Sequence, residues 1–331
     1  MALRIIHTAD WHIGASRNLP NYLKRQEDAL NELVEKTKEY NPDVFVITGD
    51  IFDSNTPREE ERCLIVSTLT NLLVQNPNMQ LLIVGGNHDW DKQNNSMLDS
   101  IDLSYKIAGT RFKVVARETE LVRIKNANFL CIPCEQNYTK EKLKKIVKRF
   151  HKNINGDFYV CMHECFKSFN DLGKQLGKES LPKLSFVKCW MLGDIHKHQF
   201  LLDNAWYSGS LLQINFGEKP NKGFVLVDDG KPTFIRIKSP MKLVTINQGD
   251  EVPENCLVKY RITDVSTINK CELPENVVVF GSDIKPAEVD TSLFTDDVTE
   301  GLSEFLANKF GYSKKAQRKS VKYIQALLNT A

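Results

Sequence analysis

Short apolar runs alternate with amphipathic stretches along the first part of the chain. Short apolar runs are typical of buried strands, whereas apolar residues that recur every three or four positions indicate helices. This pattern predicts two helices that separate three strands, in the order Leu3–Ile6, Leu23–Tyr40, Asp43–Thr48, Cys63–Val74 and Gln80–Val84. Such an alternation favours parallel strands with helices on the faces of the sheet, and therefore an α/β fold.

Beyond about residue 105 the strand signals become shorter and closer together. They occur at Val114-Val115, Leu121-Val122, Phe129-Leu130, Tyr159-Val160, Trp190–Leu192, Gly223–Val227 and Thr233–Ile237. Lys238-Ser239-Pro240 then interrupts the pattern, so we place a domain boundary near residue 238. Short strand signals at Leu243–Ile246, Cys256–Ile262 and Val277–Phe280 predict a small α+β domain over residues 239–288.

One predicted helix in the middle of the chain is strongly basic. Between Lys140 and Lys152 there are seven lysine and arginine residues, opposed only by Glu141. Four apolar residues form a stripe along it: Leu143, Ile146, Val147 and Phe150. The basic residues are either the solvated face of an ordinary amphipathic helix, which we favour, or a contact for nucleic acid.

Residues 289–331 predict a C-terminal helix pair. Thr295 is a suitable N-cap for the first helix, Gly311 ends it, and Ser313 can cap the second. Every formal charge after Glu304 is positive. The pair either packs on its own domain or docks on a partner protein.

Composition narrows the class of protein. The 331 residues are 41% hydrophobic and 26% charged, and the formal net charge is +2, so a globular core is expected and a polycation is excluded. No apolar run approaches the roughly 18 residues of a membrane span, and the start lacks a signal peptide, so we expect a soluble, cytoplasmic protein. Cys131 and Cys134 resemble half of a zinc knuckle, but we interpret them as buried thiols.

Polar clusters follow the predicted strands. They are Asp10-Trp11-His12, Gly49-Asp50-Ile51-Phe52-Asp53, Gly86-Asn87-His88-Asp89, His163 and Gly193-Asp194-Ile195-His196. Ligands of open α/β sheets bind at the carboxyl ends of strands, so these clusters should converge. Carboxylates, an amide and imidazoles are suitable ligands for Mn²⁺, Fe²⁺ or Zn²⁺, and the set predicts a site for two metal ions.

The series D-x-H, GD-x-x-D, GNHD, a single His and a final G-x-x-H resembles the calcineurin-like metallophosphoesterase superfamily. GDIFD followed by Asn55-Thr56-Pro57 resembles the SbcD family of nuclease subunits, and Lys222–Val227 also fits that family. The resemblance implies a β-sandwich flanked by helices over residues 1–238, a capping domain at 239–288 and helices at 289–331 that dock an ATPase. Size and the short capping region are similar to bacteriophage exonuclease subunits.

The resemblance also implies roles for individual residues. One metal ion would be held by Asp10, His12, Asp50 and His196, and the second by Asp50, Asn87, His163 and Asp194. Asp194 departs from the family pattern G-H-x-H, which leaves the choice of metal open. His88 would be catalytic, and Asp53 and Asp89 would orient the histidines. His198 is interpreted as a polar residue at the edge of the cleft rather than as a ligand.

The function implied is that of a metal-dependent DNA nuclease with two divalent ions, Mn²⁺ favoured and Mg²⁺ compatible. It would act as a 3′-to-5′ exonuclease on duplex ends and as an endonuclease on single strands, in DNA repair and recombination. The implied partners are DNA and an SbcC-like coiled-coil ATPase, with a homodimer inside a heterotetramer, in a bacterial host's cytoplasm if the chain is phage-encoded. Two alternatives stay open: a phosphoesterase for small molecules or phosphoproteins, and a DNA-end-binding scaffold whose nuclease activity Asp194 weakens.

Overall fold

The computed structural model describes residues 3–90, 96–99, 101, 111–135, 138–152, 154–262 and 274–282. The chain divides into two compact units. The first unit comprises Met1–Val244 with Asn255–Leu257, and the second Thr245–Glu254 with Val258–Ala331. The helix pair that the sequence predicts at 289–331 lies outside the described residues. No helix in the described part of the chain is long and apolar enough to cross a membrane.

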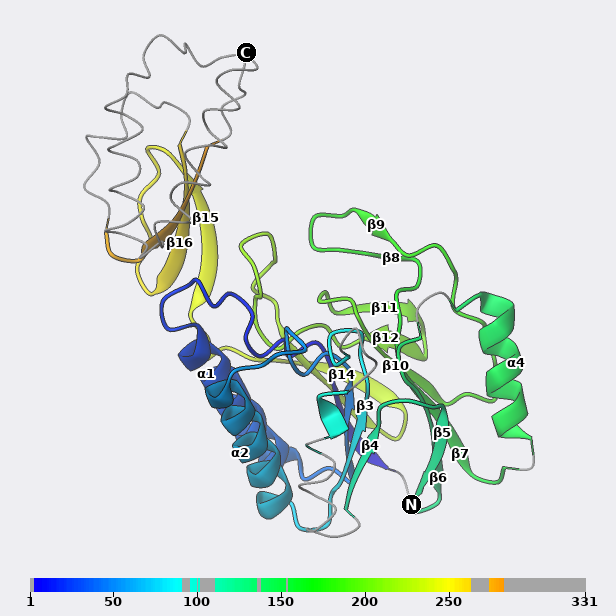
Figure 1. Cartoon of the computed structure of the whole chain (residues 1–331). Helices are drawn as coiled ribbons and strands as arrows, with labels where there is room; N and C mark the ends of the chain where they lie inside the picture. The colour runs from blue at the N-terminus through cyan, green and yellow to red at the C-terminus, as the bar shows by residue number, and fades with distance from the viewer. Residues whose placement is uncertain are drawn as a thin grey trace. The chain divides into compact units, whose positions relative to one another are not determined.

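The first unit contains two six-stranded sheets (Figure 1). The first sheet has the strand order β14-β13-β1-β2-β3-β4. Its strands are β1 (Arg4–Thr8), β2 (Val44–Thr48), β3 (Gln80–Val84), β4 (Phe112–Val115), β13 (Gly223–Asp228) and β14 (Lys231–Arg236). Strands β1 to β4 are mutually parallel, whereas β13 is antiparallel to β1 and returns the chain to this sheet.

The second sheet has the order β11-β12-β10-β7-β6-β5. Its strands are β5 (Glu120–Ile124), β6 (Ala127–Ile132), β7 (Asp157–His163), β10 (Cys189–Gly193), β11 (Gln199–Leu202) and β12 (Ala205–Tyr207). The four central strands are parallel, and the two edge strands, β5 and β11, are antiparallel to their neighbours. A separate hairpin joins β8 (Ser168–Phe169) to β9 (Gln175–Leu176).

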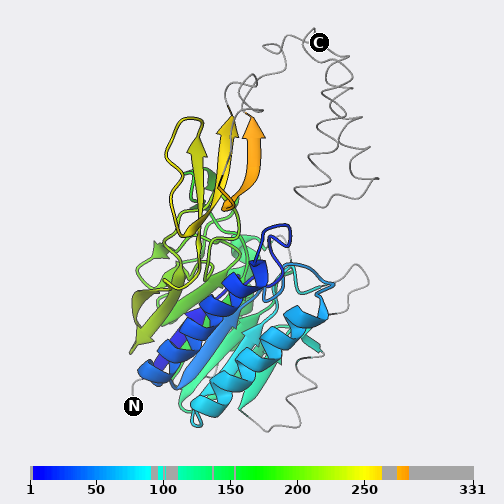
Figure 2. The same ribbon diagram turned by 90° about the vertical axis from the view of Figure 1, so that its left-hand side faces the viewer.

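The two sheets pack face to face and helices cover their outer faces. Ile5 and Val46 of the first sheet and Tyr159 and Met191 of the second belong to one core cluster between the sheets. The opposite face of the first sheet packs on α1 (Tyr22–Tyr40) and α2 (Glu59–Gln75), which run side by side in Figure 2. On the far side, α4 (Lys140–His151) covers the second sheet (Figure 1). This layering confirms the predicted β-sandwich flanked by helices.

Helix α2 begins earlier than the apolar pattern predicts. Its first turn consists of three glutamates, which favour a helix N-terminus. Glu61 is fully buried, accepts a hydrogen bond from the Arg58 backbone at 2.7 Å, and forms a two-point ion pair with Arg17 at 2.7 and 2.5 Å. These charged residues do not continue the apolar pattern, so the pattern places the helix start too late. Through the ion pair of Glu61 with Arg17, they also anchor the helix to the loop after β1.

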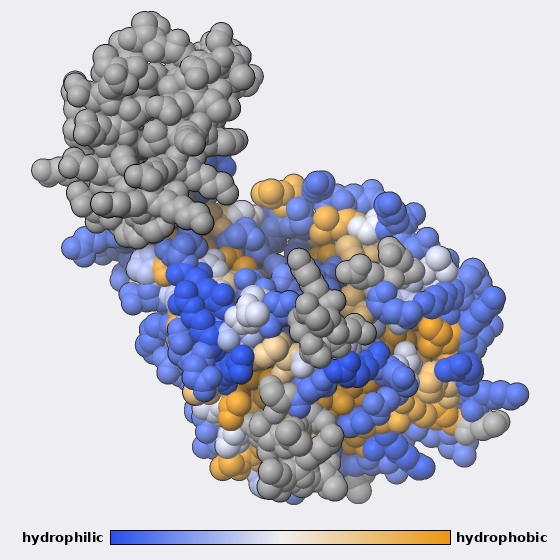
Figure 3. All heavy atoms as spheres, viewed as in Figure 1, coloured by the Kyte–Doolittle hydropathy of each residue, from blue (hydrophilic) through white to orange (hydrophobic). Residues whose placement is uncertain are grey.

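The basic helix α4 is amphipathic, as predicted. Thr139 caps it by accepting a hydrogen bond from the Lys142 backbone at 3.2 Å. Leu143 and Val147 are buried, with Ile146 and Phe150 packed against the same core cluster. Figure 3 shows the face of the first unit that is seen in Figure 1. Hydrophilic side chains dominate this face, and apolar side chains form patches between them. Whether the basic face contacts nucleic acid stays a prediction.

The sheet that the sequence predicts after residue 238 is also present. Its three strands, β15 (Lys242–Asn247), β16 (Cys256–Ile262) and β17 (Val277–Ser282), appear yellow to orange in Figure 2. Strands β16 and β17 are parallel. The described part of this region thus matches the predicted strands, and its role as a capping domain stays a prediction.

Candidate metal centre

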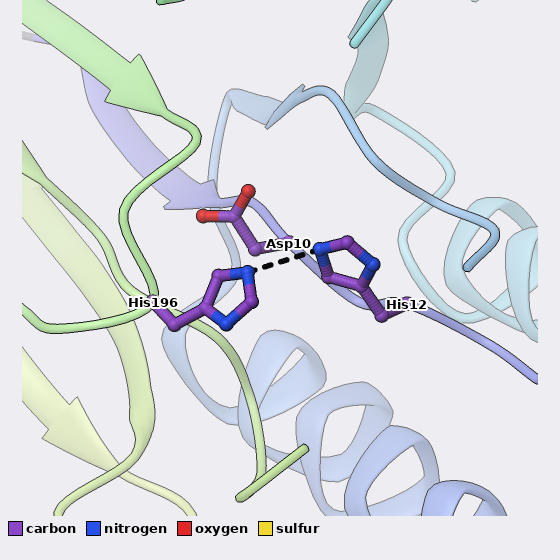
Figure 4. A group of neighbouring side chains, drawn as sticks. All are labelled: Asp10, His12 and His196. Carbon is purple, nitrogen blue, oxygen red and sulfur yellow. Dashed lines mark hydrogen bonds between the residues drawn. The ribbon is translucent and has the colours of Figure 1, made fainter. Parts of the chain in front are cut away.

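The structure brings the predicted ligands together at the carboxyl ends of the strands. Three overlapping groups have potential ligand atoms within 4.8 Å of one another: Asp10, His12 and His196; His12, Asp50 and His88; Asp10, Asp50 and His163. Asp10 follows β1, Asp50 follows β2 and His163 ends β7, so both sheets contribute. Figure 4 shows the side chains of the first group turned toward one another.

The backbone that carries these side chains is strained. Asp10, His12, Asp50 and Asp194 all have positive φ angles, of 53°, 44°, 54° and 99°. Residues other than glycine rarely adopt this left-handed region, which costs of order 1–3 kcal/mol each. The Asp10 and His12 amides donate to the carbonyls of Gly49 and Asp50 at 3.1 and 3.0 Å, which holds the strained turn in place. Strain of this kind is concentrated at functional sites.

Glycines let the strand ends approach one another closely. A Cβ atom on Gly86 would lie 2.2 Å from Asp50 Oδ1, and one on Gly49 would lie 2.2 Å from His163 Nδ1. Any larger residue at either position would displace a predicted ligand. The Gly-Asp and Gly-Asn dipeptides of the sequence are therefore required by packing as well as by turn formation.

The first group suits a cation. His12 Nδ1 lies 3.2 Å from Asp53 Oδ1, and His196 Nδ1 lies 2.9 Å from Glu218 Oε1, so both Nδ1 atoms donate to carboxylates. The two Nε2 atoms then present lone pairs to each other at 3.1 Å (Figure 4). Asp10 Oδ2 is buried beside them without a hydrogen-bond partner. A metal ion would satisfy all three atoms, so the donor set fits the ion that the sequence predicts.

The residues predicted to hold the second ion are arranged in the same way around His163. Its Nδ1 atom donates to the Thr48 carbonyl at 2.8 Å. Its Nε2 atom faces three oxygens: Asn87 Oδ1 at 2.9 Å, Asp50 Oδ2 at 3.3 Å and Asp194 Oδ1 at 3.7 Å. Burial alone would lower the pKa of His163, but the surrounding carboxylates, Asp50 foremost, raise it well above its usual value. The cluster thus attracts positive charge, as a metal site must.

His88 belongs to the group that also contains His12 and Asp50. Its backbone amide donates to Asp50 Oδ1 at 2.9 Å, and its Nδ1 atom donates to the Asp53 carbonyl at 2.8 Å. The ring contacts the His12 ring edge to face, with centroids 4.8 Å apart. Since Nδ1 is engaged, Nε2 is the atom left to exchange a proton with a substrate.

Asp89 acts on the backbone rather than on a histidine. Its buried carboxylate accepts hydrogen bonds from the amides of Gly86, Asp50 and Ile51 at 2.8, 3.0 and 3.2 Å. Burial and the charge of Asp50 raise the pKa of Asp89 to about 7. Asp53 does contact a histidine, as expected, whereas Asp89 ties the turn after β3 to the turn after β2.

Sequence reasoning missed Glu218. Its carboxylate binds His196 Nδ1, the Ile214 amide at 3.1 Å and the ammonium of Lys222 at 2.8 Å. Burial would raise the pKa of Glu218, but His196 and Lys222 lower it to about 2. The only available signal was its position four residues before the Lys222-Gly223 pair, in a loop without periodicity.

Replacing Glu218 should weaken metal binding without unfolding the protein. Glu218→Gln keeps the shape but removes the charge that orients His196, so we expect about 10- to 100-fold weaker affinity for Mn²⁺. Calorimetric titration of metal-free protein measures this. Glu141→Gln on the exposed face of α4 is the matched control and should bind like the wild type. Equal affinities for both variants would refute the role of Glu218.

His198, Cys131 and Cys134 lie outside the groups of candidate ligands. His198 Nδ1 bonds to the Tyr207 carbonyl at 2.9 Å and its ring stacks on Phe234 at 4.4 Å, so it is packed away from the ligands. Cys131 is buried and Cys134 half-buried, and neither forms a disulfide. In the described part of the chain, no group of candidate ligands includes a cysteine.

Comparison with known proteins identifies the class. The family model "Calcineurin-like phosphoesterase" matches residues 3–197, more than half of the chain, and the chain belongs to this family. Calcineurin-like phosphoesterases are the class to which the fold and the clustered ligands also point.

More particular relatives are nuclease subunits. The chain is 25% identical over 315 residues to the SbcD protein of the SbcCD nuclease of Staphylococcus epidermidis, with 80% of each chain covered. It is 28% identical over 290 residues to the corresponding protein of Staphylococcus saprophyticus, covering 78% of this chain and 76% of the relative. The predicted resemblance to SbcD is thereby confirmed. A solved structure, the protein TT1561 of Thermus thermophilus, aligns with a TM-score of 0.44 and 11% identity over 72% of this chain and all of that one.

Proposed function

We propose that the protein is a metal-dependent DNA nuclease that hydrolyses phosphodiester bonds with two divalent ions, Mn²⁺ favoured and Mg²⁺ compatible. The observation that carries this proposal is the pair of facing Nε2 atoms of His12 and His196, 3.1 Å apart, beside the unpartnered Asp10 Oδ2. Atoms arranged in this way repel one another unless a proton or a metal ion lies between them. Membership of a phosphoesterase family and the similarity to SbcD nucleases support the substrate class.

Each residue has an assigned task. Asp10, His12, Asp50 and His196 hold one ion, and Asp50, Asn87, His163 and Asp194 hold the other. When bound, the ions supply an activated water and neutralise the phosphate oxygens. His88 presents Nε2 to the substrate, where it protonates the leaving sugar oxygen or stabilises the charge that develops there. Asp53 and Glu218 keep His12 and His196 in the tautomer that leaves Nε2 free for a metal.

The biological setting is proposed from the relatives. Both are named as one subunit of a two-component nuclease, SbcCD. We therefore propose an SbcC-like ATPase as the partner and a homodimer inside a heterotetramer. The chain would act as a 3′-to-5′ exonuclease on duplex ends and as a single-strand endonuclease, in DNA end processing, repair and recombination.

The direct test is cleavage of labelled DNA by the purified chain with Mn²⁺. We expect shortening of duplexes from the 3′ end and opening of circular single strands, abolished by EDTA. A panel of nitrophenyl phosphates separates a nuclease from a small-molecule phosphoesterase, and metal analysis should find two ions per chain. Rapid turnover of the small esters with intact DNA would contradict the proposal, and so would one ion per chain with no cleavage.

A further inference from the structure

A cavity of about 250 Å³ in the first unit is surrounded by positive charge. Its basic lining residues are Arg25, Lys222, Arg236, Lys238 and Lys242. They come from α1, from the loop that follows β12, and from the end of β14 with the segment after it. Among the described residues that line this cavity there is no aspartate or glutamate. We call it the basic cavity.

Arg25 is a buried member of this basic lining. It is only 4% exposed, and its guanidinium donates to two backbone carbonyls, Met241 at 2.9 Å and Gln213 at 3.2 Å. No carboxylate in the described residues forms an ion pair with it, and burial lowers its pKa to about 10. A buried guanidinium without a counter-ion is costly, because carbonyl dipoles replace only part of its lost hydration.

The residues at the rim of the basic cavity add further positive charge, although the Glu32 carboxylate accepts a hydrogen bond from the Lys238 backbone amide at 2.8 Å. Lys238 and Lys242 are exposed, and Arg236 donates to the Pro220 carbonyl at 3.3 Å. None of these three forms an ion pair with a carboxylate in the part of the chain that the structure describes. Lys222 differs, since Glu218 and Asp171 neutralise it at 2.8 and 3.4 Å. The excess positive charge of the cavity therefore resides on Arg25 and the rim.

The walls of the basic cavity are also the supports of the metal ligands. Lys222 donates to the His196 carbonyl at 2.8 Å. On α1, the residue after Arg25 is Gln26, whose side chain donates to the His12 carbonyl at 3.1 Å. The helix that carries Arg25 and the loop that carries Lys222 thus also fix the two histidines whose Nε2 atoms face each other.

We propose that the basic cavity binds a phosphate group, either a backbone phosphate of a nucleic-acid strand or the terminal phosphate of a released nucleotide. Arginine and lysine donors around a small cavity suit a tetrahedral oxyanion. The choice of phosphate over other oxyanions rests on the proposed function. Binding there would provide the counter-ion that Arg25 lacks.

Thermal unfolding with inorganic phosphate tests the site itself. The measurement is made in EDTA, which removes metal from the candidate metal centre. Phosphate should then raise the wild-type Tm by several degrees more than chloride of equal ionic strength. Arg25→Met and the double variant Lys238→Ala/Lys242→Ala should lose this rise. The double variant changes only exposed residues, so it decides the question if Arg25→Met does not fold. Lys231→Ala, an exposed lysine at the other end of β14, is the matched control and should respond like the wild type.

The salt dependence of DNA binding, also in EDTA, separates the two sources of phosphate. If a strand occupies the cavity, the slope of log K against log salt should fall by about one to two in the double variant and stay unchanged in Lys231→Ala. If the double variant keeps the wild-type salt slope but its Tm no longer rises with phosphate, the ligand is the released nucleotide. A phosphate response that persists in every variant overturns the proposal. Neither measurement requires cleavage, so an inactive wild type would refute the proposed function alone.

Discussion

His88→Ala should reduce DNA cleavage by about 10²- to 10⁴-fold while the bound metal stays unchanged. The imidazole is the only part of His88 that can exchange a proton, whereas its hydrogen bond to Asp50 is donated by the backbone amide, which alanine retains. Single-turnover cleavage rates and metal analysis on the same sample measure both effects. A variant that keeps the wild-type rate would refute the catalytic role of His88.

A comparison of substrates with different leaving groups distinguishes the two roles proposed for His88, proton transfer and charge stabilisation. If it protonates the sugar oxygen, the loss should be much smaller with a nitrophenyl ester of a nucleotide, because nitrophenolate departs without a proton. His88→Asn can keep a donor for the Asp53 carbonyl but cannot exchange a proton, so it should be as slow as the alanine variant. His151→Ala on α4, whose ring stacks on Phe186 at 4.0 Å, is the matched control and should cleave normally. Equal losses with DNA and the ester would favour electrostatic stabilisation over proton transfer.

The sequence predicted the strands that are buried on both faces. In β2 every residue of Val44–Thr48 is buried, because α1 and α2 cover one face and the second sheet covers the other. Such strands appear as continuous apolar runs that are easy to recognise. Strands β11 (Gln199–Leu202) and β12 (Ala205–Tyr207) escaped prediction because they are too short for a periodic signal. They become strands only by pairing with β10 and with each other.

The site was predictable for a related reason. Parallel strands place their carboxyl ends at one edge, so polar residues that follow the strands converge wherever they occur in the sequence. Glu218 escaped because it follows no predicted strand and lies 22 positions from His196, beyond β11 and β12. Asp89 was recognised as a supporting residue, but its partners could not be predicted, since they are backbone amides exposed by the strained turn at Asp50.

Asp50→Asn should have the second large effect, the loss of both metal binding and cleavage. Asp50 belongs to two of the three groups of candidate ligands, and its Oδ2 atom lies 3.5 Å from His12 Nε2 and 3.3 Å from His163 Nε2. It is thus the carboxylate that joins the two halves of the site. In metal sites generally, loss of a residue that supports a ligand weakens metal binding by up to about 100-fold. Replacing a ligand itself should weaken the binding further. Titration with Mn²⁺ and metal analysis after dialysis measure the loss.

Stability provides an independent measurement of the same prediction. Mn²⁺ that binds only the folded state should raise the Tm of the wild type but not of Asp50→Asn. Without metal the variant should be less stable than the wild type at neutral pH: burial alone would raise the pKa of Asp50, but His163 and His12 hold it below its usual value, so the charge of Asp50 stabilises the folded state. Asp53→Asn makes the same chemical change three residues away, at a carboxylate that only orients His12, and should lose about 10- to 100-fold in affinity. If Asp50→Asn binds Mn²⁺ as tightly as Asp53→Asn, Asp50 is not a shared ligand.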